Sequence, residues 1–60
     1  MSDRPSHAQI SEAYMKGWLA GDVGAPKHLC PHGSGDKASA ILRGHWLAGW
    51  NDRDMEKANG

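Results

Sequence analysis

Small and apolar residues recur at helical spacing in the first third of the chain. The positions are separated by three or four residues: Ile10, Ala13, Tyr14, Gly17, Trp18 and Gly21. Positions with this spacing lie on one face of an α-helix. Ser6 can cap this helix, and Gln9, three residues later, can complete a capping box. Gly24 suits a left-handed C-cap, and Pro26 prevents the helix from resuming. We therefore predict a helix from about Ser6 to about Val23.

A second helical stretch follows a segment that is rich in turn-forming residues. Residues 25–36 include Pro26, Pro31, Gly33, Ser34 and Gly35, so this segment is predicted to be a loop. Leu29 and Cys30 are its apolar pair and are expected to pack under the loop against the helices. Asp36 or Ser34 can cap the second helix, which is expected to persist to about Lys57. Its predicted inner face is Ala38, Ile41, Leu42, His45, Trp46 and Gly49.

The two predicted helices share the sequence Trp-Leu-Ala-Gly, 28 residues apart. Glycine inside a helix costs about 0.5–1 kcal/mol relative to alanine, so its repeated use indicates that two backbones approach closely. Each helix carries a stripe of small residues that would allow this: Ala13, Gly17 and Gly21 on the first, and Ala40, Gly44 and Ala48 on the second. We predict an all-α fold, a pseudo-symmetric two-helix antiparallel hairpin with a Cys-Pro and Gly-rich connecting loop. Residues 1–60 would form a single domain, with Trp18 and Trp46 mainly in its core and Trp50 partly exposed.

Size and composition narrow the classes of function. A chain of 60 residues forms too small a core for a deep catalytic cleft. No apolar run approaches the roughly 18 residues of a membrane-spanning helix. The first residues lack the pattern of a secretory signal, and the lone Cys30 cannot form an internal disulfide, so we expect a cytoplasmic protein.

The charge is neutral overall but unevenly distributed. Residues 13–50 carry a surplus of two positive charges, and each end carries a net charge of minus one. The middle of the chain can therefore present a mildly basic surface to phosphate groups. The candidate RNA-binding residues are Lys16, Lys27, His28, His32, Lys37, Arg43 and Trp50, the last as a ring on which an unpaired base could stack. The alternative is that the cations only solvate the surface.

Other motifs have simpler explanations than a catalytic or metal site. His28, Cys30 and His32 suggest zinc, with His7 or His45 as further ligands, but the usual two spaced pairs are missing. Residues 33–37 lack the spacing and the preceding strand of a nucleotide-binding loop. The charged run at residues 52–57 is read as a solvated helix end. No metal, cofactor or catalytic residue is predicted, and Cys30 is expected to act as a small buried apolar residue beside Pro31.

Taken in order, several short motifs resemble the ribosome modulation factor family over about residues 12–53. They are Ala13, Lys16-Gly17-Trp18, Ala20-Gly21, Gly24, Lys27, Leu29-Cys30-Pro31 and Trp46-Leu47-Ala48-Gly49-Trp50. The resemblance implies that Lys16 and Lys27 match basic positions of the family. It also assigns structural roles to Gly17, Trp18, Gly21, Gly24, Cys30, Pro31, Trp46 and Gly49.

The resemblance implies a non-enzymatic factor that binds the small ribosomal subunit and its RNA near the message channel, and that represses translation in slow growth by promoting ribosome dimerisation. Two features depart from the family pattern: the neutral charge, which reduces phosphate contacts, and a longer segment at about His32 to Lys37. Two alternatives are a protein-interaction module on the same fold and a small antibiotic-modifying protein, since relatives have been described as fluoroquinolone-resistance proteins. A homodimer through Leu19, Leu47 or Trp50 is a further expectation.

Overall fold

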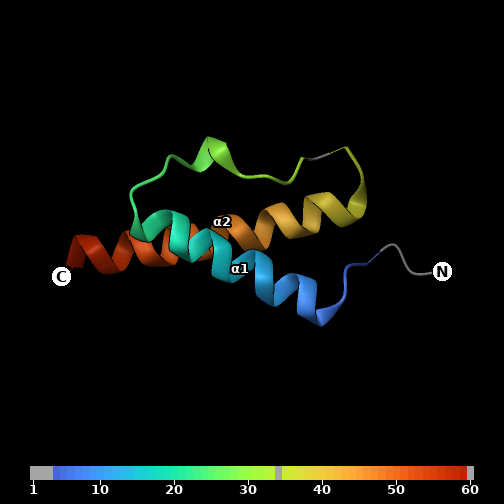
Figure 1. Ribbon diagram of the computed structural model, residues 1–60, viewed down its shortest axis with the longest axis horizontal. Helices are drawn as coiled ribbons and strands as arrows, with labels where there is room; N and C mark the ends of the chain where they lie inside the picture. Colours follow the sequence, from blue (N-terminus) through green and yellow to red (C-terminus); the bar gives the residue numbers. More distant parts are fainter. Residues whose placement is uncertain (1–3, 34, 60) are drawn as a thin grey trace.

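The computed structural model describes residues 4–33 and 35–59. This part of the chain contains helix α1 (His7–Asp22), the short 3-10 helix η1 (Lys27–Leu29) and helix α2 (Lys37–Asn59), and it has no strand (Figure 1). The two long helices pack against each other, which confirms the all-α, two-helix class. None of the described helices is both long and apolar enough to cross a membrane.

Local sequence signals determine both ends of α1. The Ser6 hydroxyl accepts a hydrogen bond from the Gln9 amide at 3.2 Å, and the Gln9 side chain accepts one from the Ser6 amide at 2.8 Å. This is the predicted capping box, which satisfies amides that have no partner inside the helix. The helix ends at Asp22, and Gly24 has a φ of 79°, the left-handed conformation that glycine adopts without strain. These two predictions are confirmed.

The predicted antiparallel arrangement is wrong, because α1 and α2 run in the same direction. Gly17 packs against the backbone of Trp46, and Gly21, one turn later, packs against that of Trp50. Contacts that advance together along both helices define a parallel pair, and Figure 1 shows both helices running from right to left. The chain returns through residues 23–36, called here the connecting segment.

The length of the connecting segment makes the parallel arrangement accessible. Fourteen residues separate Asp22 from Lys37 and can span at most about 46–50 Å. The 16-residue α1 is only about 24 Å long at 1.5 Å per residue. The segment therefore has ample length to lead back to the start of α1, where α2 begins.

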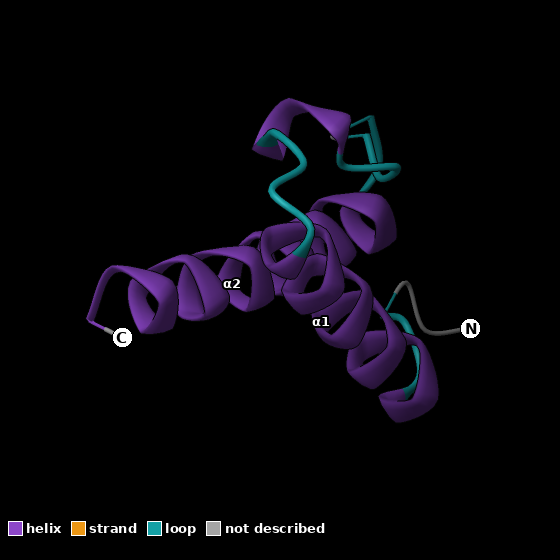
Figure 2. Ribbon diagram, turned by 60° about the vertical axis from the view of Figure 1, so that its left-hand side comes forward, coloured by secondary structure: helices purple, strands orange, loops and turns teal. Residues whose placement is uncertain are grey.

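Three glycines allow the helices to cross at close range (Figure 2). A Cβ atom on Gly17 would overlap the carbonyl group of Trp46, and one on Gly49 would overlap the carbonyl group of Tyr14. At Gly21 an added Cβ would lie 2.9 Å from the carbonyl oxygen of Trp50. The cost of glycine inside a helix is thus offset by backbone contacts that no other residue permits.

The small-residue stripe predicted for α2 does not face α1. Ala40, Gly44 and Ala48 are exposed, and a Cβ on Gly44 would meet no atom within 4 Å. Gly44 lies roughly 160° around the helix from Trp46, the large side chain that α2 buries with 3% of its surface exposed. Burial of the indole outweighs contact between two small stripes. The Trp-Leu-Ala-Gly repeat therefore does not produce the predicted symmetry, and His45, placed on the inner face by the spacing, is exposed.

The expected burial of the loop's apolar pair is also only partly observed. Leu29 is 59% exposed and Cys30 is half-buried, because η1 lies on the connecting segment away from the contact between the helices. Trp18, expected mainly in the core, is half-buried, as is Trp50. The observed core is therefore smaller than predicted and is centred on Ala13 and Trp46.

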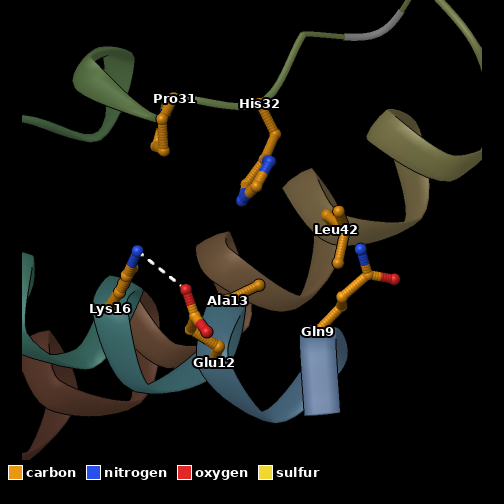
Figure 3. Close-up of a pocket in the computed structure, with 7 residues that line it drawn as sticks. All are labelled: Gln9, Glu12, Ala13, Lys16, Pro31, His32 and Leu42. Carbon is orange, nitrogen blue, oxygen red and sulfur yellow. Dashed lines mark ion pairs between the residues drawn. The ribbon is translucent and has the colours of Figure 1, made fainter. Parts of the chain in front are cut away.

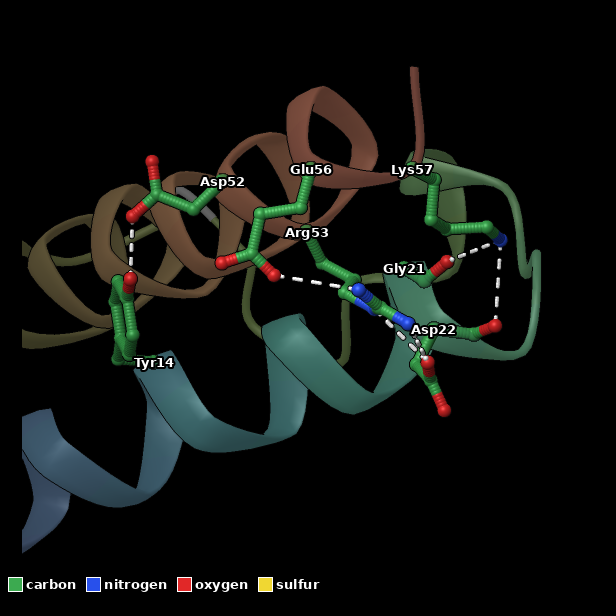
Figure 4. Close-up of polar contacts among 7 residues, drawn as sticks. All are labelled: Tyr14, Gly21, Asp22, Asp52, Arg53, Glu56 and Lys57. Atoms are coloured by element: carbon green, nitrogen blue, oxygen red, sulfur yellow. Dashed lines mark hydrogen bonds and ion pairs between the residues drawn. The ribbon is translucent and has the colours of Figure 1, made fainter. Parts of the chain in front are cut away.

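The charged run near the end of α2 is not merely solvated, because it binds α1 (Figure 4). Arg53 pairs with Asp22 at 2.7 Å and with Glu56 at 3.2 Å. Its guanidinium group also lies 4.8 Å from the centre of the Trp18 ring. A cation over an aromatic face and beside a carboxylate fixes the position of both helices.

Lys57 completes the end of α1 from the other helix. Its Nζ donates to the carbonyl oxygens of Gly21 at 3.0 Å and Asp22 at 3.2 Å (Figure 4). The last carbonyl groups of a helix have no partner within it and carry partial negative charge. The Gly21 carbonyl also accepts from the Gly24 amide at 3.2 Å, so the lysine from α2 adds a second donor there, a donor at Asp22 and the favourable charge.

Candidate nucleic-acid interface

The connecting segment is attached to α2 at Trp50. The indole Nε1 of Trp50 donates to the carbonyl oxygen of Ala25 at 2.7 Å, and the Nζ of Lys27 lies 5.8 Å from the centre of the indole ring. Within η1, the amides of Leu29 and Cys30 donate to the carbonyls of Pro26 and Lys27. One aromatic side chain therefore positions the first cation of the connecting segment.

An open pocket of about 350 Å³ lies between η1 and α2 and is called here the η1 pocket. Its lining comes from both elements: Lys27, His28, Arg43, Leu47 and Asn51. Arg43, Leu47 and Asn51 lie on one face of α2 because they are spaced by four residues. Two cations, an imidazole, an amide and one apolar side chain thus surround a single space. No carboxylate is among the lining residues.

A second pocket of about 250 Å³ lies nearer the start of α1 and is called here the α1 pocket (Figure 3). It is lined by Gln9, Glu12, Ala13, Lys16, Pro31, His32 and Leu42. Lys16 forms an ion pair with Glu12 at 2.9 Å, and the His32 imidazole points from the connecting segment toward the helices. The hydrogen bond from Lys16 lowers the pKa of Glu12 below its usual value. This pair leaves little net charge for an incoming anion.

The residues predicted to contact RNA thus lie at the two pockets, except for Lys37. Lys27, His28 and Arg43 line the η1 pocket, and Trp50 adjoins it through Lys27. The α1 pocket contains Lys16 and His32. Lys37, the first residue of α2, is exposed and lines neither of these pockets. Except for Lys37, the predicted contacts lie on or against the connecting segment.

Sequence reasoning missed Leu47 and Asn51 as members of the site. Their spacing from Arg43, four and eight residues, is the signal that could have found them. Neither Lys27 nor Arg43 forms an ion pair with the described part of the chain. In contrast, Lys16 is paired with a carboxylate. The η1 pocket is therefore the more electropositive of the two.

The acidic contacts of α2 lie on another side of the helix. Asp52 follows Arg43 by nine residues, about two and a half turns, so the two side chains point in opposite directions. Asp52 accepts a hydrogen bond from the Tyr14 hydroxyl, and this bond raises the pKa of Tyr14 above its usual value. The hydrogen bond with Asp22 likewise raises the pKa of Arg53. These residues hold the helices together and leave the η1 pocket free of their negative charge.

The described residues do not assemble a metal site. No group of three or more His, Cys, Asp or Glu side chains comes together in this part of the chain. Cys30 is a half-buried free thiol.

Comparison with known proteins identifies the family. The sequence profile of the family described as "Ribosome modulation factor" matches residues 2–58. The chain belongs to the ribosome modulation factor family. It is 39% identical over 57 residues to the ribosome modulation factor of Cellvibrio japonicus, covering 95% of this chain and 70% of that protein. It is 37% identical over 57 residues to the one from Tolumonas auensis, covering 95% and 90% of the two chains.

A third member, from Aeromonas veronii, aligns over the whole of this chain and 93% of its own length at 35% identity. No solved structure matches the chain. The match to the family profile extends beyond the residues that carry the resemblance in the sequence and includes most of the end of α2, where Arg53 and Lys57 bind α1. Family membership thus covers both helices and the connecting segment between them.

Proposed function

We propose that this member of the family is a ribosome-associated modulator that binds RNA of the small subunit through the side crossed by the connecting segment. It would act stoichiometrically, in the cytoplasm, by occupying the ribosome and repressing translation during slow growth. The observation that carries the proposal is the convergence of Lys27, His28 and Arg43 on one open pocket, in a chain that belongs to this family. The names of the relatives supply the ribosome as the partner.

Electrostatics supports RNA binding on the side crossed by the connecting segment. Phosphate groups are bound by cations that are free to reach them, and Arg43 and Lys27 have no competing carboxylate partner in the described part of the chain. Three other cations are already engaged: Lys16 with Glu12, Arg53 with Asp22 and Glu56, and Lys57 with the end of α1. A chain with zero net charge thus still presents a cationic side, because four of its carboxylates, those of Glu12, Asp22, Asp52 and Glu56, are used in contacts between and along the helices.

Co-sedimentation with purified bacterial small subunits tests the proposal. At low salt the protein is expected to move with the subunit through a sucrose gradient, and binding should weaken as salt rises. The double variant Lys27→Gln/Arg43→Gln, checked for unchanged helix content by circular dichroism, is expected to stay at the top of the gradient. Wild-type protein that remains at the top at low salt would overturn the proposal.

One observation favours a second candidate, a protein-interaction module. Met15 and Leu19 on α1 and Val23 at its C-cap are spaced by four residues and are 55%, 49% and 77% exposed. They lie on the face of α1 away from Gly17 and Gly21 and form an apolar row without a partner. If this row carried the function, Leu19→Gln would abolish binding to a protein partner or to a second copy, and RNA binding would be unchanged.

A further inference from the structure

The η1 pocket has the size of a site for one small organic group. Its volume of about 350 Å³ is at the lower end of the range of about 300–1,000 Å³ that small-molecule sites occupy. Such a space accepts one base with its phosphate and is too small for a base-paired stem. The pocket thus distinguishes between forms of RNA that a flat cationic surface would bind alike.

The lining residues provide the separate contacts that a nucleotide requires. Lys27 and Arg43 come from the two opposing elements and can both reach a phosphate placed between them. Leu47 offers an apolar surface, and the Asn51 amide offers a donor and an acceptor for the edge of a base. The imidazole of His28 is a planar group on which a base can stack.

Two features prepare the pocket for an anion in advance. Trp50 fixes the start of the connecting segment through its bond to Ala25, and its ring lies under the Lys27 ammonium group. The rival α1 pocket has neither advantage, because its cation, Lys16, is already paired with Glu12. A negatively charged ligand is therefore directed to the η1 pocket.

We propose that the η1 pocket binds a single unpaired nucleotide, with its phosphate between Lys27 and Arg43 and its base against Leu47 with the polar edge toward Asn51. This inference rests on the proposed function and makes it more specific, since it names the form of nucleic acid that the site selects. The shared chemistry is a nucleoside monophosphate unit, which an extruded residue of RNA or a free nucleotide would supply.

Binding assays on the full chain separate these sources. The probes are a short unstructured RNA oligonucleotide, a fully base-paired RNA stem with closed ends, and free adenosine monophosphate, followed by calorimetry and by the NMR signals of the Arg43 and Trp50 side-chain N–H groups. We expect the oligonucleotide to bind at least about tenfold more tightly than the stem. If adenosine monophosphate shifts the same signals and competes with the oligonucleotide, the pocket also binds a free nucleotide, and this result would support the inference. Absence of binding by both the oligonucleotide and the free nucleotide would overturn the inference.

Matched variants distinguish binding in the η1 pocket from non-specific attraction between the RNA and positive charges on the protein. Arg43→Gln is expected to weaken oligonucleotide binding about tenfold or more, because a hydrogen bond to a charged group is lost. Asn51→Leu, which preserves charge and approximate shape, is expected to reduce it about fivefold and to remove any preference among bases. Lys37→Gln removes the same charge outside the pocket and is expected to have little effect.

The outcomes also distinguish this inference from the proposed function. The inference would be overturned if Arg43→Gln and Lys37→Gln lost the same amount of affinity for the oligonucleotide. Equal affinity of the wild-type protein for the stem and the oligonucleotide would also overturn it. Co-sedimentation with small subunits that Arg43→Gln and Asn51→Leu leave intact would do the same while the proposed function stands. Failure of the wild-type protein to co-sediment would instead overturn the proposed function, and the oligonucleotide assay would still decide whether the pocket binds a nucleotide.

Discussion

The backbone of Gly17 lies directly against the carbonyl group of Trp46, so a Cβ atom at Gly17 would overlap that carbonyl. The neighbouring atoms are backbone atoms of α2, which cannot move aside as a flexible side chain can. Because contacts between the two helices make up most of the tertiary contacts of this small chain, the distance between them at this point strongly affects its stability.

Gly17→Ala is therefore expected to destabilise the fold by at least about 2 kcal/mol, because the helices must separate. The matched control is Gly44→Ala, since Gly44 is also inside a helix but a Cβ there meets nothing within 4 Å. That variant is expected to gain about 0.5–1 kcal/mol from helix propensity. Urea denaturation followed by circular dichroism measures both. Equal effects of the two substitutions would contradict the close contact between α1 and α2.

The sequence predicted the helices well because their signals are local. The capping box at Ser6 and Gln9, the left-handed Gly24 and the spacing of Ala13 with Gly17 each depend on a few neighbouring residues. The relative direction of the helices is a different kind of property. Apolar spacing defines which face is buried but not which way the partner runs, and a connecting segment of 14 residues permits either direction.

The inner face of α2 was ambiguous because this helix has small residues on two sides. Gly44 and Gly49 are both glycines, and only the requirement to bury Trp46 decides between them. Once Trp46 and Gly49 are known to face α1, Arg53 follows at the next turn of the same face. The role of Arg53 was thus encoded in the helical spacing, although its charge favoured interpretation as a solvated end.

The candidate site was predictable in composition but not in its grouping. Lys27 and Arg43 are basic and appear in any charge analysis, whereas their convergence depends on the connecting segment turning back along α2. In an antiparallel hairpin with a tight turn, residue 27 would have no reason to lie beside residue 43. The site is therefore a consequence of the parallel arrangement.

The hydrogen bond from Tyr14 to Asp52 predicts a loss of stability in alkali. The raised pKa of Tyr14 in the folded state means that folding favours the protonated hydroxyl. This contribution is fully present below the unfolded pKa of about 10 and is lost as the pH rises through the folded pKa. Tyr14 is the single tyrosine of the chain, so tyrosinate absorbance reports on it alone.

We expect the absorbance titration of Tyr14 to have its midpoint above that of free tyrosine. Asp52→Ala is expected to return the midpoint toward the ordinary value, and the alkaline decline in unfolding free energy that Tyr14 causes should be smaller in that variant. Asp54→Ala is the control, because it removes a neighbouring carboxylate that is not the hydrogen-bond partner of the hydroxyl. Identical titrations of wild type and Asp52→Ala would rule out this hydrogen bond in solution.

The lysine that caps α1 from α2 predicts a local effect at one end of the molecule. Lys57→Met keeps much of the aliphatic chain and removes the donor to the carbonyls of Gly21 and Asp22. We expect a loss of about 0.5–1 kcal/mol, the usual size of a cation's effect at a helix end. Hydrogen exchange should accelerate most for the last turn of α1. Uniform acceleration along both helices would show that Lys57 acts on global stability instead.

Trp50 is expected to link stability of the connecting segment to RNA binding. Trp50→Phe retains an aromatic ring near Lys27 but removes the bond to Ala25. Loss of one hydrogen bond costs about 0.5–1.5 kcal/mol, so the helices should remain paired while amides of η1 exchange faster. Affinity for the unstructured oligonucleotide should fall because Lys27 is less well positioned. Unchanged exchange in η1 would show that the segment is held by other contacts.

Salt dependence gives the number of ionic contacts that the cationic side makes with phosphate groups. For single-stranded RNA the logarithm of the affinity falls with the logarithm of salt concentration with a slope of about −0.7 per phosphate contact. Two contacts, at Lys27 and Arg43, predict a shallow slope of about −1.4. Arg43→Gln should reduce it by about 0.7, whereas Asn51→Leu should lower affinity without changing the slope, because the amide carries no charge. A slope much steeper than −1.4 would mean that cations outside the η1 pocket, such as Lys37, make most of the phosphate contacts.

Asp54, three residues after Asn51 on α2, supplies the opposite test. Asp54→Asn removes a negative charge near the face of α2 that lines the η1 pocket, so it should raise the affinity for the oligonucleotide about twofold at low salt.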